Sequence, residues 1–326
     1  MWSLIFLACA PSSSPKDAVP QALDAADSVA AADLNGDGID EILLIQDGTL
    51  RWSGKTHDLG GAVHAVSRGD TDGDGTEEAL IATGTSREQR DAPARLWRVR
   101  ADAAELIWEQ RGPRSQPTSV AVLGGRIWLN TFSDERTVSG GWVEGGGLTV
   151  VREGALATAM RPLGDGVAVG RLYGDEPRSD GDLVLVGPSG SRRLPSLRGV
   201  RAMTTADLNG DGHDELIVGD GWHYNYGERA QAHVALYAGP DYDGARTLAL
   251  PAGDYAVDSL EVRDGWLLVT GARTVSAYRH DSLGWAPTAL GAVSESGNAV
   301  FARGEAGLGV VVSGSPARWV ALPPSP

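Results

Sequence analysis

The chain has 326 residues, of which 42% are hydrophobic, and its formal net charge at pH 7 is −15. This length allows two ordinary domains or one repeat architecture, and the 44 glycines are typical of many short strands and turns. No basic stripe that could release phosphate counterions is present, so we expect no nucleic-acid partner. The single cysteine, Cys9, excludes an internal disulfide.

The N-terminus is an apolar run that ends at Leu7-Ala8-Cys9 and is followed by a segment rich in serine and proline. This pattern resembles a bacterial lipoprotein signal, in which Cys9 would become the lipidated first residue and anchor the protein to the bacterial outer membrane or cell surface. One alternative is a secretory signal cleaved after Ala10, which predicts a secreted or periplasmic protein. Another is that the start codon is assigned wrongly. The run is too short to span a bilayer.

Composition predicts three regions along the chain. Residues 1–9 correspond to the signal peptide, and residues 10–26, rich in Pro, Ser, Ala and Asp, are predicted to form a flexible tether. Residues 27–326 are predicted to fold. In both signal interpretations this folded part lies outside the cytoplasm, where calcium is plentiful enough to fill weak sites.

One nine-residue pattern occurs three times, beginning at Asp33, Asp70 and Asp207. Each copy has oxygen-bearing side chains at positions 1, 3, 5 and 9 and glycine at position 6. Alternate side chains of a tightly curled loop converge on one point, and glycine supplies the positive φ that the curl needs. Carboxylate and amide oxygens favour Ca²⁺ over a soft metal. The pattern therefore predicts about three calcium sites, whereas a single copy could be an acidic surface turn.

These loops differ from EF-hands, which need a bidentate glutamate at position 12 between two helices. Position 12 is instead Leu44, Ile81 or Val218, each within a short apolar run. Such runs are typical of buried strands. We therefore expect the acidic residue at position 9 to close each site and a strand to follow it.

The remaining pattern predicts an all-β fold. Short apolar runs alternate with Gly, Asp and Pro, and no long helical pattern occurs after residue 27. The runs form seven units of about 43 residues, a length typical of four-stranded propeller blades. The units begin near residues 27, 62, 118, 157, 200, 257 and 298. We therefore predict a seven-bladed β-propeller with the acidic loops in blades one, two and five.

Seven tryptophans lie in predicted strands, and we expect them to pack between blades. They are Trp52, Trp97, Trp108, Trp128, Trp142, Trp266 and Trp319.

The sequence Asp-Leu-Asn-Gly-Asp-Gly, followed two residues later by an acidic residue and then by an apolar strand, is similar to FG-GAP/VCBS repeats. This family forms the seven-bladed propellers of integrin α-subunits and of many bacterial surface proteins. Unit five matches furthest, because residues 233–239 are similar to the family's Val-x-Leu-Tyr-x-Gly strand, although Gly219-Asp220-Gly221 stands where the family often has Gly-Ala-Pro. The resemblance covers units one, two and five, about a third of the chain.

The resemblance implies that the side chains at positions 1, 3, 5 and 9 and the carbonyl at position 7 bind calcium. These residues are Asp33, Asn35, Asp37, Ile39 and Glu41; Asp70, Asp72, Asp74, Thr76 and Glu78; and Asp207, Asn209, Asp211, His213 and Glu215.

The connections between the second and third strands are predicted to be long in units two to five, so the face that carries them is a candidate recognition surface. The connection in unit five contains Trp222, His223, Tyr224 and Tyr226. Exposed aromatic side chains with polar tips are typical of protein-binding hot spots and of sugar-stacking platforms. The alternative is that these rings fold back onto blade five.

No catalytic motif stands out. The six histidines share no metal-ligand spacing, and neither a nucleophile elbow nor a phosphate loop occurs. We therefore predict a monomeric, non-enzymatic surface protein that mediates adhesion or recognition by binding a protein or a glycan. The alternative is a propeller-type polysaccharide lyase or hydrolase, or its carbohydrate-binding accessory domain.

Overall fold

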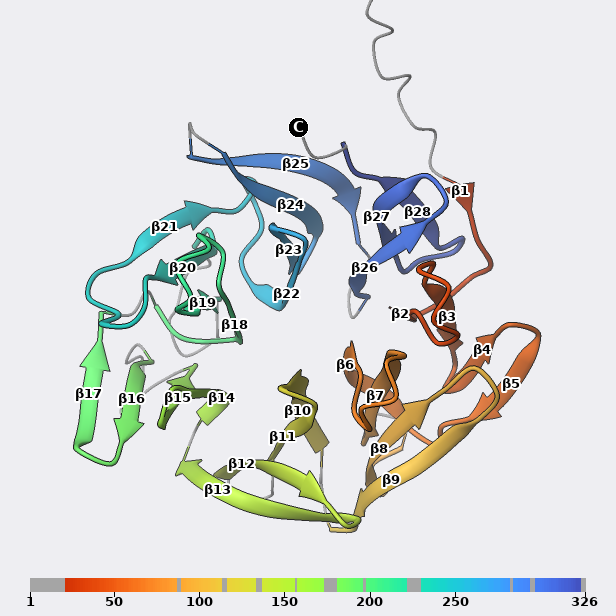
Figure 1. Cartoon of the computed structure of the whole chain (residues 1–326), viewed down its shortest axis with the longest axis horizontal. Helices are drawn as coiled ribbons and strands as arrows, with labels where there is room; N and C mark the ends of the chain where they lie inside the picture. Colours follow the sequence, from red (N-terminus) through yellow and green to blue (C-terminus); the bar gives the residue numbers. More distant parts are fainter. Residues whose placement is uncertain are drawn as a thin grey trace, which may run out of the picture.

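The computed structural model describes residues 21–86, 89–112, 116–132, 137–155, 157–172, 181–195, 198–221, 230–281, 284–293 and 297–323. Seven antiparallel sheets of four strands each surround a common axis (Figure 1). These described residues contain no helix, and therefore none that is long and apolar enough to cross a membrane. The predicted all-β, seven-bladed propeller is confirmed.

The first six blades each use four consecutive strands, numbered from the axis outwards. Blade one contains β2 (Ser28–Ala32), β3 (Glu41–Gln46), β4 (Thr49–Trp52) and β5 (Lys55–Asp58). Blade two contains β6 (Ala62–Gly69), β7 (Glu78–Gly84), β8 (Ala94–Val99) and β9 (Ala104–Gln110). Blade three contains β10 (Gln116–Leu123), β11 (Arg126–Phe132), β12 (Thr137–Glu144) and β13 (Gly147–Ala155). Blade four contains β14 (Ala157–Leu163), β15 (Gly166–Arg171), β16 (Leu183–Gly187) and β17 (Gly190–Leu194).

Blades five and six follow the same pattern, whereas blade seven takes its strands from both ends of the chain. Blade five contains β18 (Ala202–Ala206), β19 (Glu215–Gly219), β20 (His233–Tyr237) and β21 (Arg246–Ala249). Blade six contains β22 (Val257–Arg263), β23 (Trp266–Gly271), β24 (Thr274–Asp281) and β25 (Gly284–Ala292). Blade seven contains β26 (Ala299–Gly304), β27 (Gly307–Val312) and β28 (Arg318–Ala321), with β1 (Gln21–Ala22) as its outermost strand.

The hydrophobic core lies between blades rather than at the axis. Each of the seven interfaces between neighbouring blades holds its own cluster of buried apolar side chains. Second strands such as β7 and β19 are buried along their whole length, which explains their continuous apolar sequences. All seven strand tryptophans belong to these clusters, as buried or partly buried members, so their predicted packing role is confirmed.

Residues 21–26 belong to the propeller, although the sequence places them in the tether. Gln21 and Ala22 pair with Trp319 and Arg318, and Ala26 forms a bridge with Gly314. A two-residue strand has no periodicity of its own, and its partner lies almost 300 residues away, so no local signal marks it. The same pairing supplies the fourth strand that the predicted seventh blade lacks.

A side chain also holds the first and last blades together. The amide of Asn298, just before β26, accepts a hydrogen bond from the Val29 N–H and donates one to the Val29 carbonyl, each at 2.8 Å. These bonds satisfy both backbone groups of Val29 on the innermost strand of blade one. Blade seven is thus joined to blade one at its inner edge, while β1 completes its outer edge.

A group of charged side chains bridges four blades near the axis. Asp40, at the end of the first acidic loop, is fully buried and accepts hydrogen bonds from Arg68 of blade two, from Arg263 of blade six and from the backbone N–H of Arg303 in blade seven. Arg68 also pairs with Glu261 at 2.6 Å. Burial raises the pKa of Glu261, and the charge of Arg68 opposes this rise.

Removal of β1 should weaken ring closure. We expect a truncated variant that lacks residues 1–26 to melt at a lower temperature than a variant that lacks only residues 1–20, because the first loses the pairing with β28 and the Ala26–Gly314 bridge. Circular dichroism melting curves of the two proteins, recorded side by side, measure the contribution of residues 21–26 alone. Identical curves would contradict the proposed closure.

The charged group near the axis gives a second prediction. Asp40→Asn should lower the free energy of unfolding by about 3–5 kcal/mol, because it removes the buried carboxylate that pairs with Arg263 and one of the carboxylates that pair with Arg68. The matched control is Asp264→Asn, whose half-exposed carboxylate pairs with Arg303 and should contribute about 0–1 kcal/mol. Urea unfolding in the presence of a chelator measures both values. If both substitutions lowered the free energy of unfolding by the same amount, the charged group near the axis would not stabilise the ring.

Candidate metal centre

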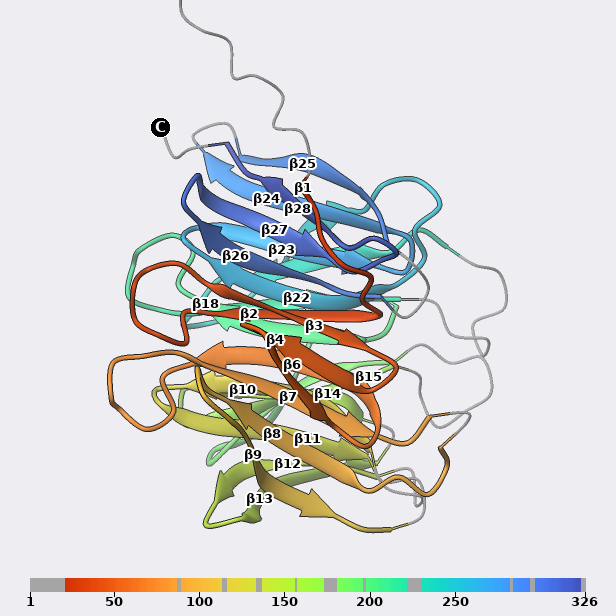
Figure 2. The same cartoon turned by 90° about the vertical axis from the view of Figure 1, so that its right-hand side faces the viewer.

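The three acidic loops connect the first and second strands of blades one, two and five. Because equivalent connections of a propeller lie on the same face, all three loops lie on one side of the ring, at the left of Figure 2. The first two loops touch each other. The Glu77 N–H donates to the Asp33 carbonyl at 3.1 Å, and the Asp33 N–H lies 3.4 Å from the Glu77 carboxylate.

The carboxylate at position 1 organises each loop from inside. One oxygen accepts the N–H of position 4 and the other accepts the N–H of position 6, at 2.6–3.0 Å in all three loops. The glycines that donate these bonds all have positive φ, between 75° and 91°. A residue with a Cβ would be strained at these six positions, which explains the repeated Gly-x-Gly spacing.

The side chains at positions 3 and 5 each accept a backbone N–H two residues further on. The bonds from position 5 to position 3 measure 2.9, 3.3 and 2.8 Å, and those from position 7 to position 5 measure 2.8 Å in every loop. In loops one and three the asparagine at position 3 also donates to the glutamate at position 9. The backbone thus fixes the direction of each oxygen-bearing side chain.

The glutamate at position 9 is the first residue of the second strand in each blade. Glu41, Glu78 and Glu215 accept the N–H of position 2 at 2.8, 2.8 and 2.7 Å. Burial raises the pKa of Glu41 and Glu215, and the nearby loop aspartates add to the rise. A strand therefore follows the acidic residue at position 9, as predicted from the apolar runs.

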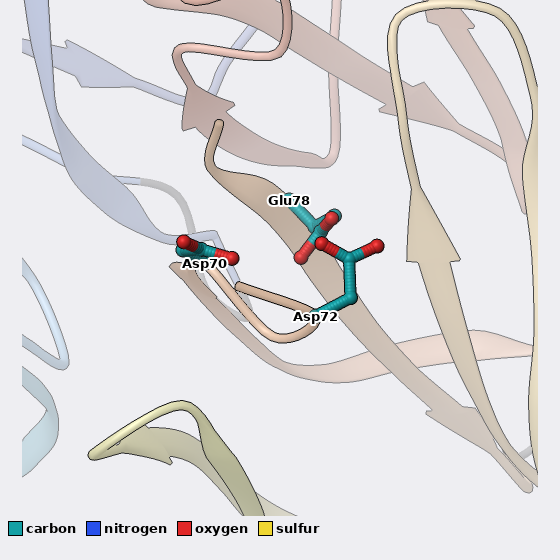
Figure 3. A group of neighbouring side chains, drawn as sticks. All are labelled: Asp70, Asp72 and Glu78. Atoms are coloured by element: carbon teal, nitrogen blue, oxygen red, sulfur yellow. The ribbon is translucent and has the colours of Figure 1, made fainter. Parts of the chain in front are cut away.

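Loop two has the densest group of carboxylates. Among the described residues, only Asp70, Asp72 and Glu78 place three carboxylates so that one oxygen from each lies within 4.8 Å of the others (Figure 3). Asp74 is not in this group, and its carboxylate accepts both the N–H and the hydroxyl of Thr76. Loops one and three have an asparagine at position 3 and do not bring three carboxylates together.

Arg100, in the turn between β8 and β9, is the counter-charge of loop two. Its guanidinium pairs with Asp72 and lies 3.4 Å from Glu78. The sequence did not identify this residue, because it lies 28 positions from Asp72 and no motif contains it. Asp40 and Arg68 were missed for the same reason, since they lie 28 residues apart and meet Arg263 and Glu261 of blade six only when the ring has closed.

The chemistry of the three loops fits a hard divalent cation better than a soft one. Every candidate ligand is a carboxylate, an amide or a backbone oxygen, and no sulfur or imidazole nitrogen is among them. His213 contributes its backbone at position 7, and its side chain is exposed. In loop two, the Arg100 guanidinium pairs with the carboxylates of Asp72 and Glu78, which a cation would also bind.

Several predicted residues lie outside the described part of the chain. They are Cys9, Trp222, His223, Tyr224 and Tyr226. Parts of the four connections that are predicted to be long also lie outside it. The strand bounds confirm long connections in blades two, four and five. The prediction for blade three is wrong, because β11 and β12 extend further than expected and leave only residues 133–136 between them.

No family model matches this sequence, and no curated protein matches it. Similarity to solved structures concerns the fold. The extracellular domain of BT4673 from B. thetaiotaomicron is 12% identical with a TM-score of 0.57, and the alignment covers 95% of this chain and 40% of that one. This chain therefore spans less than half the length of that protein.

Two further structures superpose over almost the whole chain. Sqt1 from Saccharomyces cerevisiae is 11% identical with a TM-score of 0.52, and the alignment covers 94% of this chain and 98% of that one. A chain of the mitotic checkpoint complex is 13% identical with a TM-score of 0.56, with 98% and 100% covered. Such low identity supports the β-propeller fold alone.

Proposed function

We propose that this chain is a calcium-stabilised, non-enzymatic propeller of the FG-GAP/VCBS type that recognises a protein or a glycan outside the cytoplasm. The observation that carries the proposal is the repeated framework of the three acidic loops. Three segments far apart in the sequence share the same hydrogen bonds at positions 1, 3, 5 and 9. An acidic surface turn would not need this pattern three times.

Calcium would have a structural role in this proposal. Each loop joins the first two strands of a blade, and its carboxylates repel one another when no cation is present. A bound Ca²⁺ would supply the compensating charge and couple its binding free energy to folding. Asp33, Asp70 and Asp207 would then tie the inner hairpins of blades one, two and five.

Recognition is assigned to the opposite face of the ring. That face carries the second-to-third connections of each blade, which are long in blades two, four and five. Loops on a rigid scaffold commonly carry binding residues. The expected lipid anchor on Cys9 and the extracellular origin of the BT4673 domain support a location outside the cytoplasm.

Removal of calcium should destabilise the protein. At a free calcium concentration one hundred times the Kd, each site should stabilise the fold by about 2.7 kcal/mol, so chelation should lower the melting temperature. Asp37→Ala and Asp211→Ala should each lower it even with calcium present. The control is Glu305→Ala, an exposed acid in the equivalent turn of blade seven. A melting curve unchanged by chelator would refute the calcium proposal.

Arg100→Gln should strengthen calcium binding at loop two. The substitution removes a cation that pairs with Asp72 and Glu78, and such a partly exposed ion pair is worth at most about 1 kcal/mol, or roughly fivefold in affinity. Isothermal titration calorimetry measures the change. Arg111→Gln, which removes a guanidinium from an exposed pair with Glu109, is the matched control. If Arg100→Gln bound calcium more weakly than Arg111→Gln, the proposed competition between Arg100 and calcium would be contradicted.

Joint replacement of Trp222, Tyr224 and Tyr226 by alanine should abolish binding to a glycan or protein partner and leave the melting curve unchanged. The reason is that aromatic side chains with polar tips dominate the energy of such interfaces. A glycan array and a thermal melt of the same protein preparation separate the outcomes. A lowered melting temperature would show instead that the rings pack onto blade five.

A further inference from the structure

Two of the three acidic loops lie in neighbouring blades. Loop one belongs to blade one and loop two to blade two, and the innermost strands of these blades, β2 and β6, are in contact. Loop three, in blade five, lies across the ring, with two blades between it and either of the other loops (Figure 1). Only the first two loops therefore have another acidic loop as a neighbour.

The backbone of Asp33 joins these two loops directly. Its carbonyl accepts the Glu77 N–H at 3.1 Å, and its N–H lies 3.4 Å from the Glu77 carboxylate. Asp33 is position 1 of loop one. Glu77 is position 8 of loop two, between the Thr76 carbonyl and the Glu78 carboxylate that are expected to bind calcium. A residue that would hold one ion is thus bonded to the segment that would hold the next.

Apolar contacts reinforce this junction. Leu34, at position 2 of loop one, is 4% exposed and belongs to the same buried cluster as Ala79, the residue that follows Glu78. The methyl group of Thr76 lies close to Gly36 of loop one, since a Cβ added to Gly36 would be 3.2 Å from it. A movement of either loop therefore displaces atoms that the other loop contacts.

One arginine also links the residues at position 8 of the two loops. The Arg68 guanidinium, two residues before loop two, lies 3.3 Å from the buried Asp40 carboxylate and 3.9 Å from the Glu77 carboxylate. Asp40 directly precedes Glu41, and Glu77 directly precedes Glu78. Each partner of Arg68 therefore adjoins the glutamate that closes its own loop.

Loop three has no equivalent connection. Among the described residues, no hydrogen bond or ion pair joins residues 207–215 to either of the other acidic loops. Its residue at position 8, Asp214, accepts through its carbonyl a hydrogen bond from Tyr242 of the same blade at 3.3 Å. The first turns of the neighbouring blades four and six are two-residue turns that contain Asp165 and Asp264. Loop three is therefore an internal comparison for the other two.

The contacts at Asp33 can couple two binding events. When the Asp33 carboxylate holds an ion, its backbone becomes ordered, and the bonds to Glu77 then restrict residues 76–78 of loop two. An ion that enters loop two afterwards meets a segment that is already ordered, so less conformational entropy is lost. The reverse order of binding gives the same factor, because coupling between two binding equilibria is reciprocal.

Electrostatics acts in the opposite direction. A cation in loop one weakens the negative potential that attracts a cation to loop two. Positions 3 to 5 of both loops are exposed, so salt screens this effect, with a Debye length of about 8 Å at physiological ionic strength. The hydrogen bonds and apolar contacts at the junction are not weakened in this way. At physiological or higher salt we therefore expect the structural coupling to prevail.

We propose that loops one and two bind calcium cooperatively, through the contacts between Asp33 and Glu77, whereas loop three binds it independently. The inference rests on the proposed calcium function and adds how its sites depend on one another. The inner hairpins of blades one and two are then stabilised together, over a narrower range of calcium concentration than the hairpin of blade five.

The glycine at position 6 gives a separate signal for each loop. The N–H groups of Gly38, Gly75 and Gly212 donate to the position-1 carboxylate of their own loop at 2.8, 3.0 and 2.9 Å, so their NMR signals should change when that carboxylate binds an ion. The test is a calcium titration of the full chain at about 0.15 M salt. We expect a Hill coefficient above 1 for Gly38 and Gly75 and a hyperbolic curve for Gly212.

Removal of one site should weaken only its neighbour. Asp37→Ala removes position 5 of loop one and should raise the calcium midpoint of Gly75 by about fivefold or more. Asp211→Ala removes the equivalent carboxylate of loop three and is the matched control, which should leave Gly75 unchanged. The shift caused by Asp37→Ala should persist at about 1 M salt, where the Debye length falls to about 3 Å and the effect of a lost charge fades.

A variant at the junction tests the contact itself. Glu77→Ala keeps every proposed ligand but removes the carboxylate near the Asp33 N–H, so the Hill coefficients of Gly38 and Gly75 should fall towards 1. Asp214→Ala, at the same position of loop three, is the control and should leave both coefficients unchanged.

The possible failures are distinguishable. If none of the three glycine signals responds to calcium, the calcium proposal fails and the coupling fails with it. If Gly38 and Gly75 respond with hyperbolic curves, or if the effect of Asp37→Ala on Gly75 disappears at high salt, the coupling alone is overturned. Should Asp37→Ala not fold, the shape of the Gly38 and Gly75 curves in the unchanged chain decides.

Discussion

The closure of the ring is the constraint on which the rest of this structure depends. No blade can bury both faces of its sheet alone, and each of the seven apolar clusters is built from two neighbouring blades. The cluster between blades seven and one forms only when both ends of the chain have come together. The pairing of β1 with β28, the Asn298 bonds to Val29 and the buried Asp40 network all act at this junction.

The residue at position 8 connects each of the first two acidic loops to other parts of the ring. Asp40 follows the first loop directly, and its partners come from blades two, six and seven. Glu77, at the equivalent position of the second loop, contacts the first loop at Asp33. The loop that organises its own carboxylates thus also places one carboxylate at the centre of the closed ring. Arginine balances the carboxylate charge near the axis, where Arg68 and Arg263 pair with Asp40, and also in loop two, where Arg100 pairs with Asp72.

The sequence was sufficient to predict the loops and strands that recur along the chain. The spacing of Asp33, Asp37 and Glu41 and the apolar run after them specify a loop followed by a buried strand, and the structure contains both. Seven groups of short apolar runs were enough to predict the seven blades. Residues whose role depends on distant partners were missed. Gln21 pairs with a strand almost 300 residues away, and Arg100 meets Asp72 from a different hairpin of the same blade.

The most direct test of the calcium account is a crystal structure of the chain grown with calcium, with an anomalous difference map. The account predicts one peak in each of the three loops, with ligand oxygens of the residues at positions 1, 3, 5 and 9 at about 2.3–2.6 Å. Crystals grown at about 10 mM calcium, above the Kd of weak extracellular sites, that show no peak in any of the three loops would contradict it.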